Sequence, residues 1–296
     1  MTRGGDHRER IREELLSWIR QNDPTGMDWY LDEGPVDEAP AAADAAAEVS
    51  GDTTAAAIAP VAQPVAAPAT GDPAFDRECH QFLTDTLELI DRGPGRTAGP
   101  PVPDKAVVLQ ALKDIVTPCT ACELSGGRTH TVFGAGNPDA AVVFIGEAPG
   151  RDEDLQGEPF VGRSGQLLTK ILGAIDYGRE DVFICNILKC RPPNNRDPQP
   201  AEVAACEPHL KRQLAILDPR VICCLGRVAA QTLLGTDASL KRLRETVHFY
   251  EGIPVLATYH PAALLRNPGW KRETWNDVRK LRALVDALAA REDRDG

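Results

Sequence analysis

The chain has 296 residues, of which 42% are hydrophobic and 5% aromatic, and its 33 basic and 44 acidic residues give a formal net charge of −11. No stretch approaches the ~20 consecutive apolar residues that a membrane-spanning helix needs, and the first residues lack the apolar segment of a secretory signal. The composition therefore excludes a membrane protein and predicts a soluble, cytoplasmic protein of one or two domains.

The negative charge is confined to the first third of the chain. Residues 1–104 contain 8 arginines, no lysine and 20 acidic residues, a net charge of −12, whereas residues 105–296 contain 25 basic and 24 acidic residues. The second part is close to neutral and can still present a basic face to phosphates. The acidic composition of the whole chain therefore does not exclude a nucleic-acid partner.

Residues 1–104 are predicted to be an acidic, Ala/Pro-rich extension with two short helices, one within 11–21 and one within 72–93. The stretch between them has too few apolar residues to offset the entropy lost on ordering, so most of the extension is expected to be disordered. A peptide around Trp18 or Trp29 that docks on an unknown protein partner is the alternative.

Residues 105–296 are predicted to form one α/β domain, because short apolar runs alternate with amphipathic segments. The predicted strands are 140–146, 181–188, 220–225 and 253–259, and the predicted helices are 107–115, 167–175, 203–217, 228–234 and 275–288. This order indicates a three-layer α/β/α fold with a central four-stranded parallel sheet. Ligands of such sheets bind at the carboxyl ends of the strands.

The first predicted strand ends at candidate functional residues. Glu147 follows Gly146 directly, and Glu153 and Asp154 follow a few residues later. Clustered carboxylates are costly unless they are solvated, bound to a metal or catalytic, and a plain acidic turn explains them equally well. A glycine-rich loop comes next, in which Phe160 is expected to be exposed and able to stack on a base. The helix start after that loop, at Arg163 and Ser164, can bind phosphate.

Two further strand ends carry polar side chains. The second strand ends at Asn186, which can offer both a donor and an acceptor to a pyrimidine edge, although a lone asparagine more often caps a turn. A basic loop that contains Arg191 comes after it. His260 ends the fourth strand, beside an apolar loop that ends in Arg266, where a catalytic and a structural role are equally plausible.

Four of the eight cysteines have the spacing of a metal site, a C-x2-C pair followed after 67 residues by a third and after 15 more by a fourth. They are Cys119, Cys122, Cys190 and Cys206. In a reducing compartment such a set suits a zinc ion or an iron–sulfur cluster better than disulfides, and the spacing does not separate the two metals. Of the others, Cys185, Cys223 and Cys224 are predicted to be core residues, and Cys79 has no role that the sequence supports.

Together these motifs, from Cys119 to Leu265, resemble the family 4 uracil-DNA glycosylases, the iron–sulfur type of the uracil-DNA glycosylase superfamily. The shared motifs are Cys119-x-x-Cys122, Arg128-Thr129 with Val132-Phe133-Gly134, Gly146-Glu147-Ala148-Pro149-Gly150 with Glu153-Asp154, Gly157-x-Pro159-Phe160-Val161-Gly162-x-x-Gly165, Asn186 with Lys189-Cys190-Arg191-Pro192-Pro193, and His260-Pro261-x-x-Leu264-Leu265-Arg266. Six motifs in the family's order are a specific signal. The resemblance covers about half of the chain and does not include residues 1–104.

The resemblance implies hydrolysis of the N-glycosidic bond of deoxyuridine in DNA, which releases uracil and leaves an abasic site as the first step of base-excision repair. The base must first be extruded from a duplex. By resemblance, Phe160 stacks on the uracil, Asn186 reads its amide edge, and Gly146 and Ala148 shape the pocket. His260 would stabilise the anionic uracil that leaves.

The resemblance also implies a cofactor and DNA contacts. A [4Fe–4S] cluster would be held by the four cysteines named above and would brace loops against the DNA backbone. The side chains expected to contact DNA are Arg163, Ser164, Arg191, Leu264, Leu265 and Arg266, of which the last three would fill the gap left by the extruded base. The enzyme is expected to act as a monomer.

The residue that activates water is left open between Glu147, which we prefer for its place at the strand end, Glu153 and, third, Asp154. Other members of the superfamily have Asp, and this family typically Gly, where this chain has Ala148.

Three alternatives to this function remain. A relative that traps the sugar covalently would carry a histidine on a loop before the last strand, where this chain has residues 241–248 and His248. A non-catalytic iron–sulfur module that binds DNA would need the cysteines but none of the polar residues at the strand ends. A broader specificity, for example for hypoxanthine, is compatible with the same pocket residues.

Overall fold

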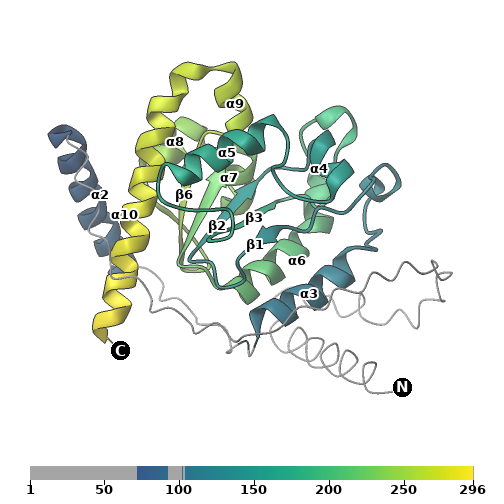
Figure 1. The fold of residues 1–296 in the computed structure, drawn as a ribbon, viewed down its shortest axis with the longest axis horizontal. Helices are drawn as coiled ribbons and strands as arrows, with labels where there is room; N and C mark the ends of the chain where they lie inside the picture. Colours follow the sequence, from purple (N-terminus) through teal and green to yellow (C-terminus); the bar gives the residue numbers. More distant parts are fainter. Residues whose placement is uncertain (1–71, 93–101, 103, 296) are drawn as a thin grey trace, which may run out of the picture.

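A computed structural model describes residues 72–92, 102 and 104–295 (Figure 1). The helix predicted within 11–21 and most of the Ala/Pro-rich extension lie outside these residues. In the described part of the chain, no helix combines the length and the apolar character needed to cross a bilayer.

One six-stranded sheet forms the centre of the fold, in the order β1-β3-β2-β4-β6-β5. Its four central strands run parallel, and each lies within one of the four predicted strands. They are β2 (Val142–Gly146), β3 (Phe183–Asn186), β4 (Val221–Leu225) and β6 (Ile253–Thr258). All residues of these strands are buried, as expected for a parallel sheet that is covered on both faces.

The prediction of four strands is incomplete, because a short antiparallel strand is added at each edge of the sheet. These strands are β1 (Ala135–Gly136), which pairs with β3, and β5 (His248–Tyr250), which pairs with β6. Segments of two and three residues are too short to show a strand periodicity in the sequence. The α/β class itself is confirmed.

Helices cover both faces of the sheet (Figure 1). The helices that follow α2 along the chain are α3 (Lys105–Val116), α4 (Arg151–Gln156), α5 (Arg163–Gly173), α6 (Pro200–Leu217), α7 (Arg227–Leu234), α8 (Leu240–Glu245), α9 (Pro261–Arg266) and α10 (Lys271–Asp295). Short 3-10 helices lie at η2 (Glu123–Gly126), η3 (Pro193–Asn195) and η4 (Pro268–Trp270). The sequence predicted the five longer helices of this set and missed α4, α8 and α9, which have six residues each.

Two hydrophobic cores result from the alternation of side chains along the strands. In β2, Val143 and Ile145 belong to the core under α3, α6 and α7, whereas Val142 and Phe144 belong to the core under α5 and α10. Each strand thus anchors helices on both faces. The carboxyl ends of the four parallel strands meet at one edge of this rigid framework.

Helix α2 (Pro73–Arg92) is the second helix predicted for the N-terminal extension, and it packs against the outer side of α10 (Figure 1). Phe75 is buried, with the guanidinium of Arg279 3.3 Å from the centre of its ring. An ion pair between Glu78 and Lys280 at 2.6 Å adds to the contact, although such exposed pairs contribute little stability.

Candidate functional site

A buried amide marks the candidate site at the carboxyl edge of the sheet. Gly146 and Asn186 are register partners at the last positions of β2 and β3. The Asn186 side chain is buried, and among the described residues its Oδ1 atom has no hydrogen-bond partner. A Cβ atom at position 146 would collide with this oxygen and with the Phe160 ring, so that only glycine fits there. The three residues are therefore in close contact around a buried acceptor that has no donor among the described residues.

The Phe160 ring also connects this group to His260, because the two ring centroids are 5.4 Å apart. The prediction that Phe160 is exposed is wrong, because only 5% of the residue is accessible. Its backbone has a φ of 54°, a left-handed conformation that is uncommon for a side chain of this size. Strain of this kind persists only where neighbouring groups impose it, and it concentrates at functional sites.

Three groups hold the Phe160 backbone in this conformation. Glu153 accepts hydrogen bonds from the N–H groups of Val161 and Gly162, both at 3.0 Å, just after it. Arg179 donates to the carbonyl oxygen of Phe160 at 3.1 Å. At Gly165, in the first turn of α5, a Cβ atom would collide with that same carbonyl group. Arg179 lies in a loop before β3 with no motif around it, so no local pattern indicates its role.

The Glu153 carboxylate is thus a structural brace. Besides the two N–H groups after Phe160, it accepts a hydrogen bond from the N–H of Gly150 at 3.1 Å, and it is buried. Asp154 has a similar role, because it accepts the N–H of Thr129 at 2.8 Å. Both carboxylates are thus occupied by backbone N–H groups.

Glu147 has a different environment, half-buried at the end of β2. Among the described residues no group donates a hydrogen bond to its carboxylate. Burial raises the pKa of Glu147, as does the charge of Asp197, whereas Arg227 lowers it. A carboxylate with a raised pKa and no fixed partner is a suitable proton acceptor.

His260 is placed by the backbone that follows it. Its Nδ1 atom accepts a hydrogen bond from the N–H of Ala262 at 3.1 Å, which leaves Nε2 as the protonated nitrogen of a neutral ring. Burial, together with the charge of Arg266, lowers the pKa of His260 to about 4. Gly226, at a φ of 98°, makes room for the ring, because a Cβ atom there would lie 3.0 Å from the His260 Cβ. The site therefore contains a neutral imidazole that can donate from Nε2.

The residues predicted to contact DNA differ in exposure. Leu265 is 41% exposed and Arg266 is exposed as well, whereas Leu264 is only 1% exposed, which does not suit a side chain that inserts between bases. Arg163 is exposed at the start of α5. The N–H groups just before it serve Glu153, so the loop itself has fewer free donors for phosphate than expected.

Of the remaining predicted residues, Ser164 and Ala148 are half-buried near the same edge of the sheet. Arg191 is half-buried as well, and its Nε donates to Asn195 Oδ1 at 2.7 Å.

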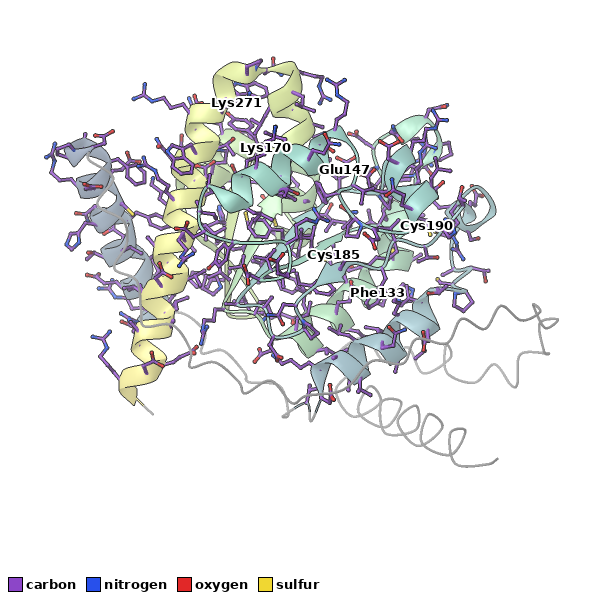
Figure 2. The ribbon with its side chains drawn as sticks, in the orientation of Figure 1. Phe133, Glu147, Lys170, Cys185, Cys190 and Lys271 are labelled. Carbon is purple, nitrogen blue, oxygen red and sulfur yellow. The ribbon has the colours of Figure 1, made fainter. Side chains whose placement is uncertain are left out.

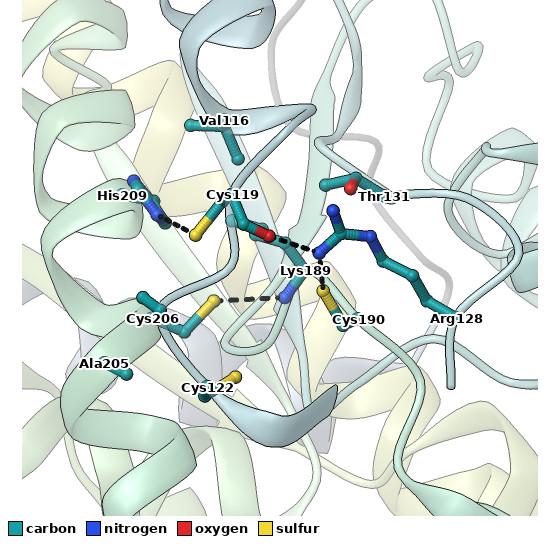
Figure 3. Close-up of a pocket in the computed structure, with 11 residues that line it drawn as sticks. Val116, Cys119, Cys122, Arg128, Thr131, Lys189, Cys190, Ala205, Cys206 and His209 are labelled. Carbon is teal, nitrogen blue, oxygen red and sulfur yellow. Dashed lines mark hydrogen bonds between the residues drawn. The ribbon is translucent and has the colours of Figure 1, made fainter. Parts of the chain in front are cut away.

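A second candidate site is a small cavity next to the sheet, lined by all four cysteines that share the metal-site spacing (Figure 3). Cys119 follows α3, Cys122 precedes η2, Cys190 follows β3, and Cys206 lies on α6. Between Cys122 and Cys190 lie 67 residues, and the fold brings these distant parts of the chain together. No three His, Cys, Asp or Glu side chains of the described residues converge closely enough to hold a single metal ion.

Nitrogen atoms surround the sulfur atoms of this cavity (Figure 3). Arg128 donates to Cys190 Sγ at 3.3 Å, and the backbone N–H of Lys189 donates to Cys206 Sγ at 3.2 Å. His209 Nε2 lies 3.3 Å from Cys119 Sγ. Burial raises the pKa of the Cys206 thiol to about 11, so that an added cation is needed to hold it as a thiolate at neutral pH. The donor set fits a group bound by thiolates.

Lys189 connects the two candidate sites. Its side chain is 1% exposed, and its Nζ donates to the backbone carbonyl of Asn186 at 2.8 Å, while its own N–H contacts Cys206. Lys189 belongs to the motif Lys189-Cys190-Arg191-Pro192-Pro193, but that motif by itself predicts no role for its side chain. A lysine inside a hydrophobic run is the signal that would have identified it, because buried lysines need a specific partner.

The other cysteines and His248 lie outside both sites. Cys185, Cys223 and Cys224 are buried within the central strands, which confirms them as core residues, and Cys79 is half-buried on α2. His248 is in the edge strand β5, where it pairs with Val255 in the middle of β6 and its Nε2 lies 3.0 Å from the Leu243 carbonyl oxygen. It does not reach the carboxyl edge of the sheet.

Comparisons with known proteins agree with this geometry. Residues 133–279 match the family model of the uracil DNA glycosylase superfamily. The type-4 uracil-DNA glycosylase of Archaeoglobus fulgidus is 47% identical over 184 residues, which cover 58% of this chain and 92% of that protein. The type-4 uracil-DNA glycosylase of Thermotoga maritima is 42% identical over 182 residues, which cover 60% of this chain and 95% of that protein. A type-5 uracil-DNA glycosylase of Thermus thermophilus is 32% identical over 149 residues, 44% and 68% of the two chains.

The two glutamates should differ in what they contribute to stability. We expect Glu153→Gln to lower the free energy of unfolding by about 1–3 kcal/mol, because the glutamine amide leaves at least one buried N–H donor unsatisfied. Glu147→Gln should change it by no more than about 0.5 kcal/mol. Urea unfolding followed by circular dichroism measures both values, and equal losses in the two variants would contradict the role of Glu153 as a brace.

Proposed function

Because the chain belongs to the type-4 uracil-DNA glycosylases of the uracil-DNA glycosylase superfamily, we infer that it hydrolyses the N-glycosidic bond of deoxyuridine in DNA. The products are free uracil and an abasic site, which starts base-excision repair. The observation in the site that supports this reaction most directly is the buried Asn186 Oδ1 without a hydrogen-bond partner.

We propose that Asn186 selects uracil. The N3–H group of uracil would supply the missing donor to Oδ1, and the Asn186 amide nitrogen would donate to the uracil O4 atom. Cytosine presents a bare N3 and an amino group at these two places, so it would leave buried groups unpaired, at about 1–3 kcal/mol for each. The Phe160 ring would stack on the base. The missing side chain of Gly146 leaves room for this ring.

His260 would act on the leaving group. As the glycosidic bond breaks, negative charge develops on the uracil, and a neutral imidazole that donates from Nε2 stabilises it at a carbonyl oxygen. The hydrogen bond from Ala262 to Nδ1 supports this proton position. A neutral donor suits an anionic leaving group, because it stabilises the charge without transferring a proton to the base.

Glu147 would orient and deprotonate the attacking water. It is the candidate that lies at the strand end without a structural hydrogen bond, whereas Glu153 and Asp154 are occupied by backbone N–H groups. An oxocarbenium-like sugar reacts with weakly activated water, so the loss of this base should cost about 10²–10⁴ in rate.

DNA would bind across the carboxyl edge of the sheet. The nucleotide must leave the base stack to reach the buried amide, and we propose that Leu265 and Arg266 occupy the space it vacates. The burial of Leu264 supports a role in holding this loop rather than in contacting bases. Arg163, Ser164 and Arg191 are proposed to contact phosphates. A monomer suffices for this arrangement, and DNA as the substrate implies a cytoplasmic, nucleoid-associated location.

The four cysteines around the cavity would hold a [4Fe–4S] cluster. This proposal is supported by the convergence of the C-x2-C segment and two single cysteines, from three separate parts of the chain, on one cavity and by the donors to two of their sulfur atoms. Such a cluster would cross-link the segment after α3, the loop after β3 and helix α6. Glycosidic hydrolysis involves no electron transfer, so the role proposed for the cluster is structural.

The function can be tested with a uracil-containing oligonucleotide. Wild-type protein should release uracil and leave alkali-labile sites, and Asn186→Ala and His260→Ala should each lower the single-turnover rate by about 10²–10³. Arg92→Ala, at an exposed position on α2, is the matched control and should leave the rate unchanged. Binding without uracil release would instead indicate a non-catalytic module, and a denaturant-stable adduct would indicate a covalent relative.

The pH dependence should identify the base. Glu147 must be ionised to accept a proton, so kcat/KM should fall as the pH decreases through its raised pKa, above the ~4.3 of an ordinary glutamate. His260 stays neutral down to about pH 4 and does not cause this decline. The slow Glu147→Gln variant should lack the decline and stay independent of pH down to about pH 4. If Glu147→Gln keeps the same acidic limb as wild type, another group is the base.

The cofactor can be tested without reference to activity. Anaerobically purified protein should contain about four iron and four sulfide ions per chain and absorb near ~400 nm. Cys122→Ala should lose most of this absorbance and the bound iron, whereas Cys79→Ala, outside the cavity, should keep both. Zinc in place of iron in the wild-type protein, or an intact spectrum in Cys122→Ala, would refute the proposed cluster.

A further inference from the structure

An exposed tryptophan lies next to the proposed active site. Trp270 belongs to η4, between α9 and α10, in a run from 265 to 273 in which every residue is exposed. Its ring stacks on that of Tyr259, with the centroids 4.6 Å apart and the planes at 10°. Tyr259 directly precedes His260, the residue that is proposed to stabilise the leaving uracil. The aromatic stack is therefore adjacent in the chain to the proposed active site.

The stack rests on a rigid support. The guanidinium of Arg244 lies 4.3 Å from the centre of the Tyr259 ring. It also makes two hydrogen bonds to Asp277, at 2.7 and 3.0 Å, and the Thr258 hydroxyl donates to the same carboxylate at 2.6 Å. The Arg244 and Asp277 side chains are only 11% and 12% exposed. One face of the Trp270 ring is thus held by the Tyr259 ring, while Trp270 as a whole is still 38% exposed.

Three exposed basic residues lie within four positions of Trp270 in the chain. Arg266, Lys271 and Arg272 are exposed, and within the described part of the chain none of them forms an ion pair, while Glu273 is the one acidic residue in the run. Figure 2 places Lys271 where α10 begins, at the same end of the molecule as Glu147. A preorganised aromatic ring among unpaired cations is the combination with which proteins bind single-stranded nucleic acid, by stacking on bases and contacting phosphates.

We propose that Trp270 stacks on an unpaired base that flanks the uracil in single-stranded DNA, while Arg266, Lys271 and Arg272 contact the adjoining phosphates. The inference rests on the proposed function and adds to it a preference for one form of the substrate. In a duplex the flanking bases are stacked and paired, so their faces are not open to Trp270. Lys271 and Arg272 would contact phosphates in both forms, because phosphates are exposed in each, whereas in a duplex Arg266 is proposed to fill the space of the extruded nucleotide.

Affinity for a uracil-free oligonucleotide tests this proposal independently of catalysis. Trp270→Ala should weaken binding to a single strand on the order of tenfold, and binding to the same sequence as a duplex by less than about twofold. Trp270→Phe should restore most of the loss. Trp275→Ala is the matched control, since Trp275 is also 38% exposed but lies beside Arg279 rather than on Tyr259.

Two further measurements separate stacking from charge. Against a strand of equal length without bases, wild type and Trp270→Ala should bind equally well. Arg272→Ala should reduce the dependence of log Kd on log salt by about 0.7 on single strands, whereas Trp270→Ala should leave that slope unchanged. An equal loss on single strand and duplex, or a loss that persists without bases, would overturn the proposal. If wild type binds as expected but releases no uracil, only the proposed function fails.

Discussion

The parallel pairing of β2 and β3 is the constraint on which the site depends. It sets Gly146 opposite Asn186 at the last positions of both strands, so that the amide lies over a residue without a side chain. Because the helices on both faces are anchored in the alternating side chains of the same strands, this register cannot shift without exposing two hydrophobic cores. The Asn186 amide, which is proposed to read uracil, is thereby held in place by the central sheet.

The loop with Phe160 is less intrinsically stable and is held from three directions. Its left-handed backbone is maintained by Glu153, Arg179 and the absence of a side chain at Gly165. The unfavourable backbone conformation lowers the stability of the loop, but it fixes the position of the Phe160 ring. An active site needs such fixed positions, because catalysis depends on preorganised groups. Of the three carboxylates considered as the base, Glu147 is the one that no backbone N–H group holds in the described part of the chain.

The cysteine cavity and the proposed uracil site are connected along the chain, because the strand that ends at Asn186 continues into Lys189 and Cys190. The buried ammonium of Lys189 donates to the Asn186 backbone, and its N–H contacts Cys206. A cluster bound by the four thiolates would therefore stabilise the segment that carries the reading amide. A cluster in this cavity would therefore support the proposed reaction by holding Asn186 in position, although the reaction itself transfers no electrons.

The sequence by itself determined the α/β class, the four parallel strands and the strand-end residues Glu147, Asn186 and His260, because buried strands are continuous apolar runs and chemistry gathers where they end. Tertiary structure alone decided the rest. The burial of Phe160 and Leu264 depends on how the folded chain packs. Arg179 bonds to the backbone of Phe160, and the N–H of Lys189 bonds to Cys206, in each case more than fifteen residues away. Glu153 holds backbone N–H groups within nine residues, but only the folded turn brings them to its carboxylate. Local patterns report which face a residue prefers, whereas a hydrogen bond such as that of Arg179 to a distant backbone leaves no trace in the chain around it.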